Sequence, residues 1–280
     1  MDKTKIKRQM KKFEEYLMVD KGLSDVTAEG YCRTLSIALR RMRKFCPQYE
    51  NIKEYMLWMY KEKYSYSYIV NSSLALEHYT KFKGIEIKLG RPKKPRYLVK
   101  NVLSEAEVSR MINATESIRI KALFCTLVFS GLRNSEVCSL RVSDVDVGQN
   151  QLRVNEGKNF KARYVNIAGE CSKVLAEYLK EYPRENDAYL FTTLVKGTKL
   201  AGGDLRKHVR TLAVRANIGR RVYPHLLRHS LATNLLNRGA SLMMIKEQLG
   251  HVFYESTLIY AVSMPFRTKS EYDYCKPAYL

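Results

Sequence analysis

The segment ALFCTLVFSGLRNSEV, at residues 122–137, joins a markedly apolar run to a short polar sequence. An apolar run of this length that ends near a glycine is typical of a helix that crosses a protein core. Arg133 and Glu136 follow this run three residues apart. On a helix this spacing puts both side chains on one face, so the carboxylate could hold the guanidinium in place. Taken alone, the fragment favours a simple surface ion pair.

The sequence on either side of this segment predicts a mainly helical domain with a small sheet. Ser104 and Glu107 form a capping box that begins a helical region. Residues 151–156 and 163–168 alternate between polar and apolar side chains, so we expect two antiparallel strands joined by the basic turn G-K-N-F-K. Helical periodicity then returns in five segments, residues 170–182, 204–218, 225–239, 242–250 and 255–262.

The first ninety residues are predicted to form a separate helical domain. Apolar positions recur at helical spacing in residues 6–19, 26–45, 52–64 and 67–82, and Ser24 is a candidate N-cap for the second segment. Residues 83–104 are rich in Gly, Pro and Lys without a sustained period, as in an extended linker. The predicted organisation is a helical domain at 1–88, a basic linker at 89–102, and a mainly α domain with a small antiparallel sheet at 103–280.

The charge balance indicates an anionic partner. The 280 residues contain 49 Lys and Arg against 28 Asp and Glu, a net charge of +21. The first 100 residues carry 23 basic and 11 acidic side chains and the remainder carry 26 and 17, so both halves are basic. A surplus of this size indicates an anionic polymer or an anionic membrane surface, and its spread over both halves favours a ligand gripped from two sides over a single disordered basic tail. We interpret the ligand as a nucleic acid, with a solvated lysine surface as the alternative.

The sequence gives no sign of a membrane, disulfide or zinc protein. The N-terminus lacks the apolar core of a secretory signal, and no apolar run approaches the roughly 18–20 residues that span a bilayer. Six cysteines are scattered singly without a C-x-x-C pair. We therefore expect a cytoplasmic protein without a membrane partner.

The segment P-H-L-L-R-H-S, residues 224–230, places His225 and Arg228 near the start of a helix, where anions are favoured. Pro224 suits the first helical turn. His225 and His229 are one turn apart, which raises a metal site as an alternative. The segment lacks the Glu of the H-E-x-x-H zinc motif, and Arg228 would oppose a divalent cation. We therefore expect no metal site and interpret His229 as a structural residue.

Together these residues suit metal-free chemistry at a phosphodiester. Arginines offer paired donors to the non-bridging oxygens and stabilise charge that develops at phosphorus. A free phenol has a pKa near ~10, so a tyrosine nucleophile needs a base and a cationic environment. His251, the late Tyr260 and a lysine of the basic turn would complete such a site.

Four segments in this order, R-N-S-E, G-K-N-F-K-A-R-Y-V, H-L-L-R-H-S and L-G-H-V-F-Y-E-S-T-L-I-Y, resemble the tyrosine recombinase (phage integrase) family, in the style of its Xer-type and archaeal members. The segment L-S-D-V-T-A-E-G-Y resembles the family's core-binding domain. The resemblance implies a site-specific DNA recombinase that cleaves and rejoins strands through a 3′-phosphotyrosine, without a cofactor. A type IB topoisomerase and a catalytically silent DNA-binding protein of the same fold are the alternatives.

The resemblance also implies a role for each matching residue. Arg133 and Arg228 would clamp the scissile phosphate, and Glu136 would support the site from behind. Lys158 would be the general acid towards the leaving 5′ oxygen. Because the turn reads G-K-N-F-K where many relatives have G-K-G-N-K, Lys161 is the alternative.

Three further roles follow from the same resemblance. His225 would take part in proton transfer with the attacking phenol, His251 would hydrogen-bond a phosphoryl oxygen, and Tyr260 would be the nucleophile. Tyr254, earlier in the same segment, would pack or hydrogen-bond a phosphate.

The implied partner is duplex DNA carrying a specific recombination site, bound by the nucleoid-associated protein as a tetramer on paired sites. The residues after Tyr260 could dock on a neighbouring protomer, with a frayed tail as the alternative. The candidate DNA-binding residues outside the catalytic set are all basic: Arg40, Arg41, Arg43, Lys44, Arg91, Lys93, Lys94 and Arg96.

Overall fold

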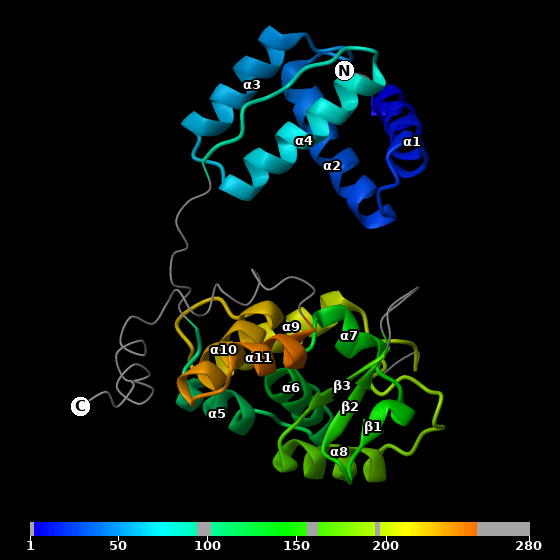
Figure 1. The fold of residues 1–280 in the computed structure, drawn as a ribbon. Coiled ribbons are helices and arrows are strands. Elements are labelled where there is room, and N and C mark those ends of the chain that lie inside the picture. The colour runs from blue at the N-terminus through cyan, green and yellow to red at the C-terminus, as the bar shows by residue number, and fades with distance from the viewer. Residues whose placement is uncertain (1–2, 94–101, 156–161, 194–196, 251–280) are drawn as a thin grey trace, which may run out of the picture. The chain divides into compact units, whose positions relative to one another are not determined.

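The computed structural model describes residues 3–93, 102–155, 162–193 and 197–250 (Figure 1). The chain divides into two compact units, Met1–Leu98 and Val99–Leu280. The described part is mainly helical with one small antiparallel sheet, as the sequence predicts. Among the described residues, the helices are all too short or too polar to span a membrane.

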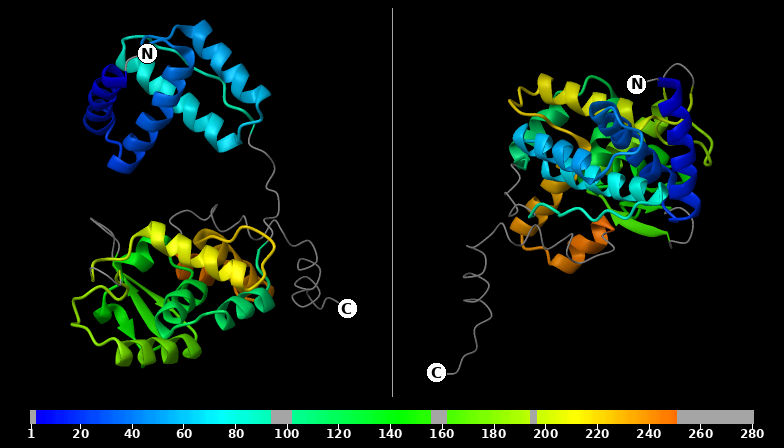
Figure 2. Two further views of the ribbon diagram at one scale, coloured as in Figure 1. Left: turned by 180° about the vertical axis from the view of Figure 1, so that it is seen from behind. Right: turned by 90° about the horizontal axis from the view of Figure 1, so that it is seen from above.

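The described residues 3–93 of the N-terminal unit form four helices, and α2 packs against each of the others (Figures 1 and 2). Their bounds are Lys3–Val19 for α1, Asp25–Met42 for α2, Tyr49–Lys61 for α3 and Tyr66–Phe82 for α4. The predicted N-cap of α2 is confirmed, because the Ser24 hydroxyl accepts a hydrogen bond from the Thr27 N–H at 3.4 Å. Phe13, Leu35 and Tyr79 lie fully buried in the core, where apolar burial stabilises the bundle.

In the second unit, helices α5, α7, α8 and α10 pack against α6, the apolar segment of the opening motif (Figure 1). The bounds of the helices described in this unit are Glu105–Asn113 for α5, Ile118–Ser130 for α6, Asn134–Ser139 for α7, Gly169–Glu181 for α8, Gly202–Arg215 for α9, Pro224–Asn237 for α10 and Leu242–Leu249 for α11; a short 3-10 turn, η1, spans Val142–Asp144. Most side chains of α6 are buried, so the predicted core helix is confirmed. The predicted capping box is also present, since Ser104 and Glu107 exchange hydrogen bonds of 2.8 and 3.2 Å at the start of α5.

The sheet holds three antiparallel strands in the order β1-β2-β3, with bounds Val145–Asp146, Gln151–Val154 and Arg163–Asn166. The predicted strand pair is β2 with β3, in the register Gln151↔Asn166. The two-residue strand β1 is too short for its alternation to be visible in the sequence. Leu152 and Val165 face the core, whereas Tyr164 on the alternate face is exposed. The basic turn between β2 and β3 lies outside the described residues at positions 156–161.

Candidate active site

Arg133 occupies the N-cap of α7 and not its interior. Its φ and ψ of −66° and 151° are extended, because α6 ends at Gly131 and the chain turns before α7 begins. The expectation that Arg133 and Glu136 share one helical face is therefore wrong in detail. The pair still forms, because a residue at the third position of a helix reaches back to its N-cap.

Glu136 accepts three hydrogen bonds. They come from the Arg133 backbone N–H at 2.7 Å, from Arg133 Nη1 at 2.7 Å and from Arg163 Nη2 at 3.0 Å. Burial opposes ionisation of this carboxyl and would raise its pKa. The Arg133 N–H together with the charges of Arg163 and Arg133 outweighs burial and holds the pKa of Glu136 below its usual range. Glu136 is therefore a fixed anion between two guanidinium groups.

Arg228 is one of the largest fully buried side chains described, with only 2% of its surface exposed. It projects from the first turns of α10, where Pro224 occupies the first helical position as predicted. Its Nη1 donates to the Gly131 carbonyl at 2.8 Å and its Nη2 donates to the Leu249 carbonyl at 2.7 Å. A buried guanidinium needs such partners, because removal of a charge from water costs several kcal/mol.

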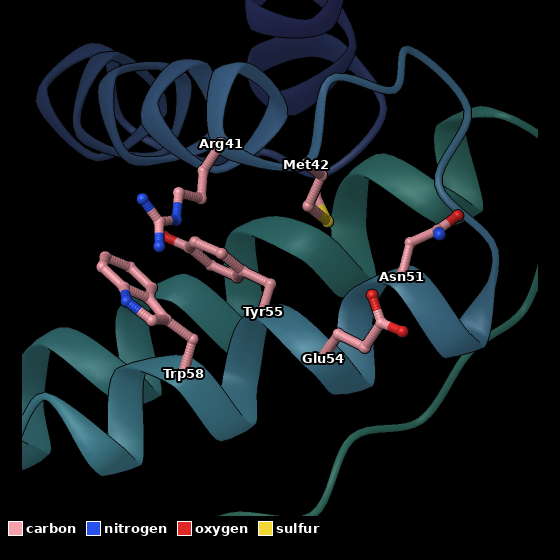
Figure 3. A pocket seen from close by; sticks show the side chains of 6 residues that line it. All are labelled: Arg41, Met42, Asn51, Glu54, Tyr55 and Trp58. Atoms are coloured by element: carbon pink, nitrogen blue, oxygen red, sulfur yellow. The ribbon is translucent and has the colours of Figure 1, made fainter.

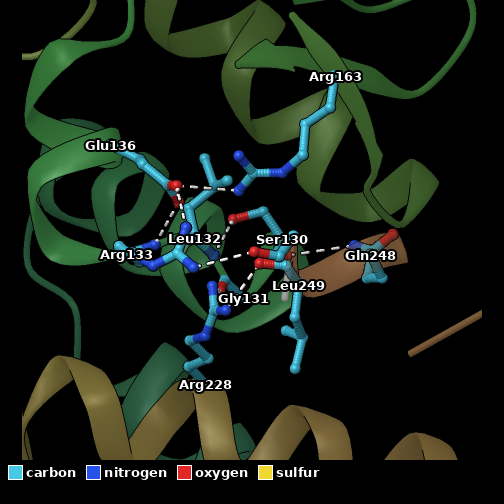
Figure 4. Close-up of polar contacts among 10 residues, drawn as sticks. Ser130, Gly131, Leu132, Arg133, Glu136, Arg163, Arg228, Gln248 and Leu249 are labelled. Atoms are coloured by element: carbon cyan, nitrogen blue, oxygen red, sulfur yellow. Dashed lines mark hydrogen bonds and ion pairs between the residues drawn. The ribbon is translucent and has the colours of Figure 1, made fainter. Parts of the chain in front are cut away.

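The two arginines meet at the C-terminal end of α11. Arg228 binds the Leu249 carbonyl (Figure 4). Arg133 Nη2 donates to the next carbonyl, that of Gly250, at 2.9 Å. The first arginine lies before α7 and the second lies on α10, so this turn joins segments that are far apart in sequence. The fold thus gathers two guanidinium groups beside residue 250, immediately before His251.

His225 and His229 lie on successive turns of α10, with ring centroids 4.5 Å apart and ring planes at 75°. His225 is exposed and His229 is 8% exposed. Within the described residues, His, Cys, Asp and Glu side chains form no group of three or more that could hold a metal ion. His225 is therefore accessible to solvent at the start of α10, whereas His229 is buried.

Several predicted site residues lie outside the described residues. These are Lys158 and its alternative Lys161, His251, Tyr254 and Tyr260, together with Lys94 and Arg96 of the linker. Their assignments stay predictions.

Two polar residues that the sequence reasoning missed support the site. Arg163 reaches Glu136 from β3. Gln248 is 6% exposed, and its amide nitrogen donates to the Ser130 carbonyl at 3.2 Å (Figure 4). The same nitrogen donates to the Asn166 carbonyl at 2.8 Å. Gln248 thereby ties α11 to both the end of α6 and β3. Each is a polar residue on an otherwise apolar face. Arg163 lies two positions before Val165 on a strand, and Gln248 lies three positions after Ile245 on a helix, so this spacing was the available signal.

The basic residues predicted at the end of α2 lie at the surface of the N-terminal unit. Arg40, Arg43 and Lys44 are exposed. The guanidinium of Arg41 lies 4.2 Å from the ring centroid of Trp58, beside a small cavity of about 180 Å³ (Figure 3). Such a cation–π contact holds an arginine in a defined position while leaving its charge available to an anion.

Arg91, the first basic residue of the predicted linker, is held by an ion pair, unlike the exposed basic residues at the end of α2. Arg91 forms a two-pronged ion pair with Glu77 of α4, at 3.0 and 2.6 Å, and Glu77 also accepts the Leu89 N–H at 2.7 Å. Burial would raise the pKa of Glu77, but the hydrogen bonds from Arg91 and Leu89 lower it overall. The first part of the linker is therefore fastened to the N-terminal unit, while Lys93 is exposed.

The sequence matches the phage integrase family over residues 101–265. The chain is 32% identical to tyrosine recombinase XerA of Pyrococcus horikoshii, over 85% of this chain and 79% of that protein. It is 28% identical to tyrosine recombinase XerD of Oceanobacillus iheyensis, over 95% of this chain and 97% of that protein.

Two solved structures are also similar to this chain. A crystal structure of XerA recombinase is 29% identical, covers 98% of this chain and all of that one, and superimposes with a TM-score of 0.58. The Tn1549 transposon integrase in complex with circular intermediate DNA has a TM-score of 0.74 over 95% of this chain and 99% of that one. At 19% identity this second likeness concerns the fold alone.

Proposed function

The chain belongs to the phage integrase family, and on that premise we propose that Tyr260 cleaves and rejoins DNA within the site organised by Arg133 and Arg228. The protein is a tyrosine recombinase, an enzyme of site-specific DNA recombination, and this function is supported over DNA relaxation or silent DNA binding. One observation carries the residue assignment: Arg133 and Arg228 donate to the adjacent carbonyls of Gly250 and Leu249.

Arg133 and Arg228 clamp the scissile phosphate in this proposal. Guanidinium groups bind non-bridging oxygens in pairs and stabilise the charge that grows at phosphorus in the transition state. Glu136 holds Arg133 at its N-cap position through contacts with both the backbone and the side chain. Because Arg228 is buried against two carbonyls, its contact with a phosphate requires a local rearrangement around residues 249–250.

His225 and Lys158 transfer the protons of the reaction. The Tyr260 phenol attacks phosphorus and loses its proton, with His225 taking part in that transfer. The bond to the 5′ oxygen breaks, and Lys158 donates the proton that makes this oxygen a hydroxyl. His251 hydrogen-bonds a phosphoryl oxygen. The product is a 3′-phosphotyrosine and a free 5′-hydroxyl, so the energy of the broken bond is kept in the protein–DNA link.

Rejoining reverses the same step with a different strand. The 5′-hydroxyl of the partner strand attacks the phosphotyrosine, the phenol leaves with a proton, and a new phosphodiester forms. Cleavage and rejoining therefore require no hydrolysis of a nucleotide such as ATP.

Duplex DNA is the substrate, as in the DNA-bound recombinases that share this fold. Both halves of the chain are basic, and the exposed Arg40, Arg43 and Lys44 supply phosphate contacts on the N-terminal unit. We expect the protein to act at a specific recombination site in the cytoplasm, on nucleoid DNA.

Strand exchange requires several protomers, and we propose a tetramer on paired sites. The second unit carries an apolar groove of about 580 Å³ between α5, α6 and α10, lined among others by Ile112, Phe129 and Leu235. The ion pair of Glu105 with Arg238, 2.7 Å long, lies at this groove. Residues 264–280, MPFRTKSEYDYCKPAYL, combine aromatic, apolar and charged side chains that suit it. We assign this tail of a neighbouring protomer as the occupant.

The test of the assignment is covalent adduct formation without metal. Nicked duplexes that trap the intermediate are selected from a random-sequence library in EDTA, and adducts are resolved on an SDS gel. Wild-type protein and the matched control Tyr254→Phe should form the adduct, whereas Tyr260→Phe should not. An adduct with Tyr260→Phe would show that the nucleophile is misassigned, and failure of the wild-type protein would refute the catalytic proposal.

A further inference from the structure

Glu136 joins two arginines that approach it from different elements. Its Oε1 atom accepts hydrogen bonds from Arg133 Nη1 at 2.7 Å and from Arg163 Nη2 at 3.0 Å. The Arg163 side chain is 16% exposed and the Glu136 side chain is 12% exposed, so water screens this pair weakly. The Arg133 side chain is 41% exposed and is the most exposed of the three.

Arg163 also lies against the backbone of Gly250. A Cβ built on Gly250 would lie 2.5 Å from Nε and 2.6 Å from Cζ of Arg163, distances that real side chains do not adopt. Gly250 has a φ of +64° and ends α11, and its carbonyl accepts the hydrogen bond from Arg133. The absence of a side chain at residue 250 thus lets the guanidinium approach the turn closely.

These contacts close a four-residue ring of Arg133, Glu136, Arg163 and Gly250. Arg133 donates to Glu136, and Glu136 accepts from Arg163 (Figure 4). Arg163 packs on Gly250, and Gly250 accepts from Arg133. The ring joins the start of α7, the start of β3 and the end of α11. The start of α7 follows Arg133, the end of α11 comes just before His251, and the start of β3 follows the basic turn that contains Lys158. Each of these three residues has a proposed role in cleavage.

We propose that Arg163 is a positioning residue for the cleavage reaction, which fixes Arg133 and the turn before His251 through this four-residue ring. This inference rests on the proposed function. Arg163 opens β3 two residues after the basic turn, so the same contact ties the base of the turn that bears Lys158 to Arg133. An arginine is required, because its extended group can bind the carboxylate through Nη2 while Nε and Cζ lie against Gly250. A lysine offers a point charge and only the first contact.

The first test compares Arg163→Met with wild type on two nicked duplexes of the selected sequence. One duplex has an ordinary scissile phosphodiester, and the other has a methylphosphonate there, which lacks one negative charge and so depends less on arginine. We expect Arg163→Met to slow adduct formation on the phosphodiester by about 10–100-fold, the range for misplaced or unsupported site residues. On the methylphosphonate the loss should shrink to within about threefold.

The controls separate positioning from stability. Arg215→Met removes an exposed ion pair with Glu116 in the same unit and should leave both rates unchanged. Arg163→Lys keeps the ion pair but not the contact of Nε and Cζ with Gly250, so its rate should fall between those of Arg163→Met and wild type. An equal loss on both duplexes, or none, would overturn the positioning role. Failure of the wild-type protein on both would instead refute the proposed function.

A second measurement tests the contact between Arg163 and Gly250 even if Arg163→Met folds poorly. Gly250→Ala must displace the Arg163 guanidinium, so it should slow adduct formation at least tenfold in the wild-type background and less than threefold in the Arg163→Lys background. Gly197→Ala is the matched control, because Gly197 has a φ of +60° with nothing within 4 Å of its added Cβ. Independent effects of Gly250→Ala and Arg163→Lys would contradict the inferred contact.

Discussion

Replacement of Glu136 by glutamine should selectively destabilise the second unit. The carboxylate accepts three hydrogen bonds, and hydrogen bonds to charged groups contribute about 1.5–3 kcal/mol each. The contact with the Arg133 side chain is discounted, because that side chain is 41% exposed and solvent screens it. The other two contacts are taken in the lower part of this range, because the Arg163 and Glu136 side chains keep 16% and 12% of their surface exposed. They suggest about 3–4 kcal/mol, of which the glutamine carbonyl restores about 1 kcal/mol. We therefore expect a loss of about 2–3 kcal/mol.

The position of the single tryptophan makes this loss measurable in the full chain. Trp58 lies on α3 of the N-terminal unit, so its fluorescence follows that unit, whereas circular dichroism follows the helices of both. For a domain of this size, a loss of 2–3 kcal/mol lowers the melting temperature by about 4–12 °C. Only the dichroism transition of the second unit should shift in Glu136→Gln.

The control is Glu116→Gln, which removes a 69% exposed carboxylate from one ion pair with Arg215. This variant should lose less than about 1 kcal/mol. If Glu136→Gln costs no more than Glu116→Gln, then Glu136 does not hold two guanidinium groups and the account of the site is wrong.

Two further predictions concern the same region. The difference in unfolding free energy between wild type and Glu136→Gln should be constant from about pH 7 to pH 5 and should shrink as the pH falls below 4.5. The reason is that folding lowers the pKa of Glu136, so its contribution disappears as the folded carboxyl is protonated. A difference that grows in acid would contradict this sign. Gly131→Ala should destabilise the second unit by about 1–3 kcal/mol, since Gly131 has a φ of +66° and the added Cβ would lie 2.7 Å from Leu249 Cδ2. The control Gly30→Ala, in helix α2 with open space around it, should instead stabilise the N-terminal unit by about 0.5–1 kcal/mol, as urea unfolding followed by Trp58 fluorescence can establish.

Local signals in the sequence predicted most helices and several of their ends. The apolar run of α6, the capping box of Ser104 and Glu107, and Pro224 at the start of α10 each depend on neighbouring residues only. The same is true of the alternation that predicted β2 and β3. Short-range hydrogen bonding and periodicity decide these features, so one sequence is enough to reveal them.

The arrangement of the site depends on longer-range contacts. The spacing of Arg133 and Glu136 predicted their ion pair, but it could not show that Arg133 is an N-cap, because the αL turn at Gly131 separates α7 from α6. Arg163 was missed because its partner lies 27 residues away and only tertiary packing brings them together. Gln248 likewise acts through Ser130, which is 118 residues away in sequence.

The most direct test of the central claim identifies the amino acid that becomes linked to DNA. Glu-specific proteolysis of the trapped adduct cleaves after Glu247 and Glu255, so Tyr254 and Tyr260 fall in different peptides. Mass spectrometry after nuclease digestion should find the nucleotide remnant on the peptide that begins at Ser256, attached to Tyr260 through a 3′-phosphate. A remnant on the peptide that contains Tyr254, on any other residue, or attached through a 5′-phosphate would contradict the account.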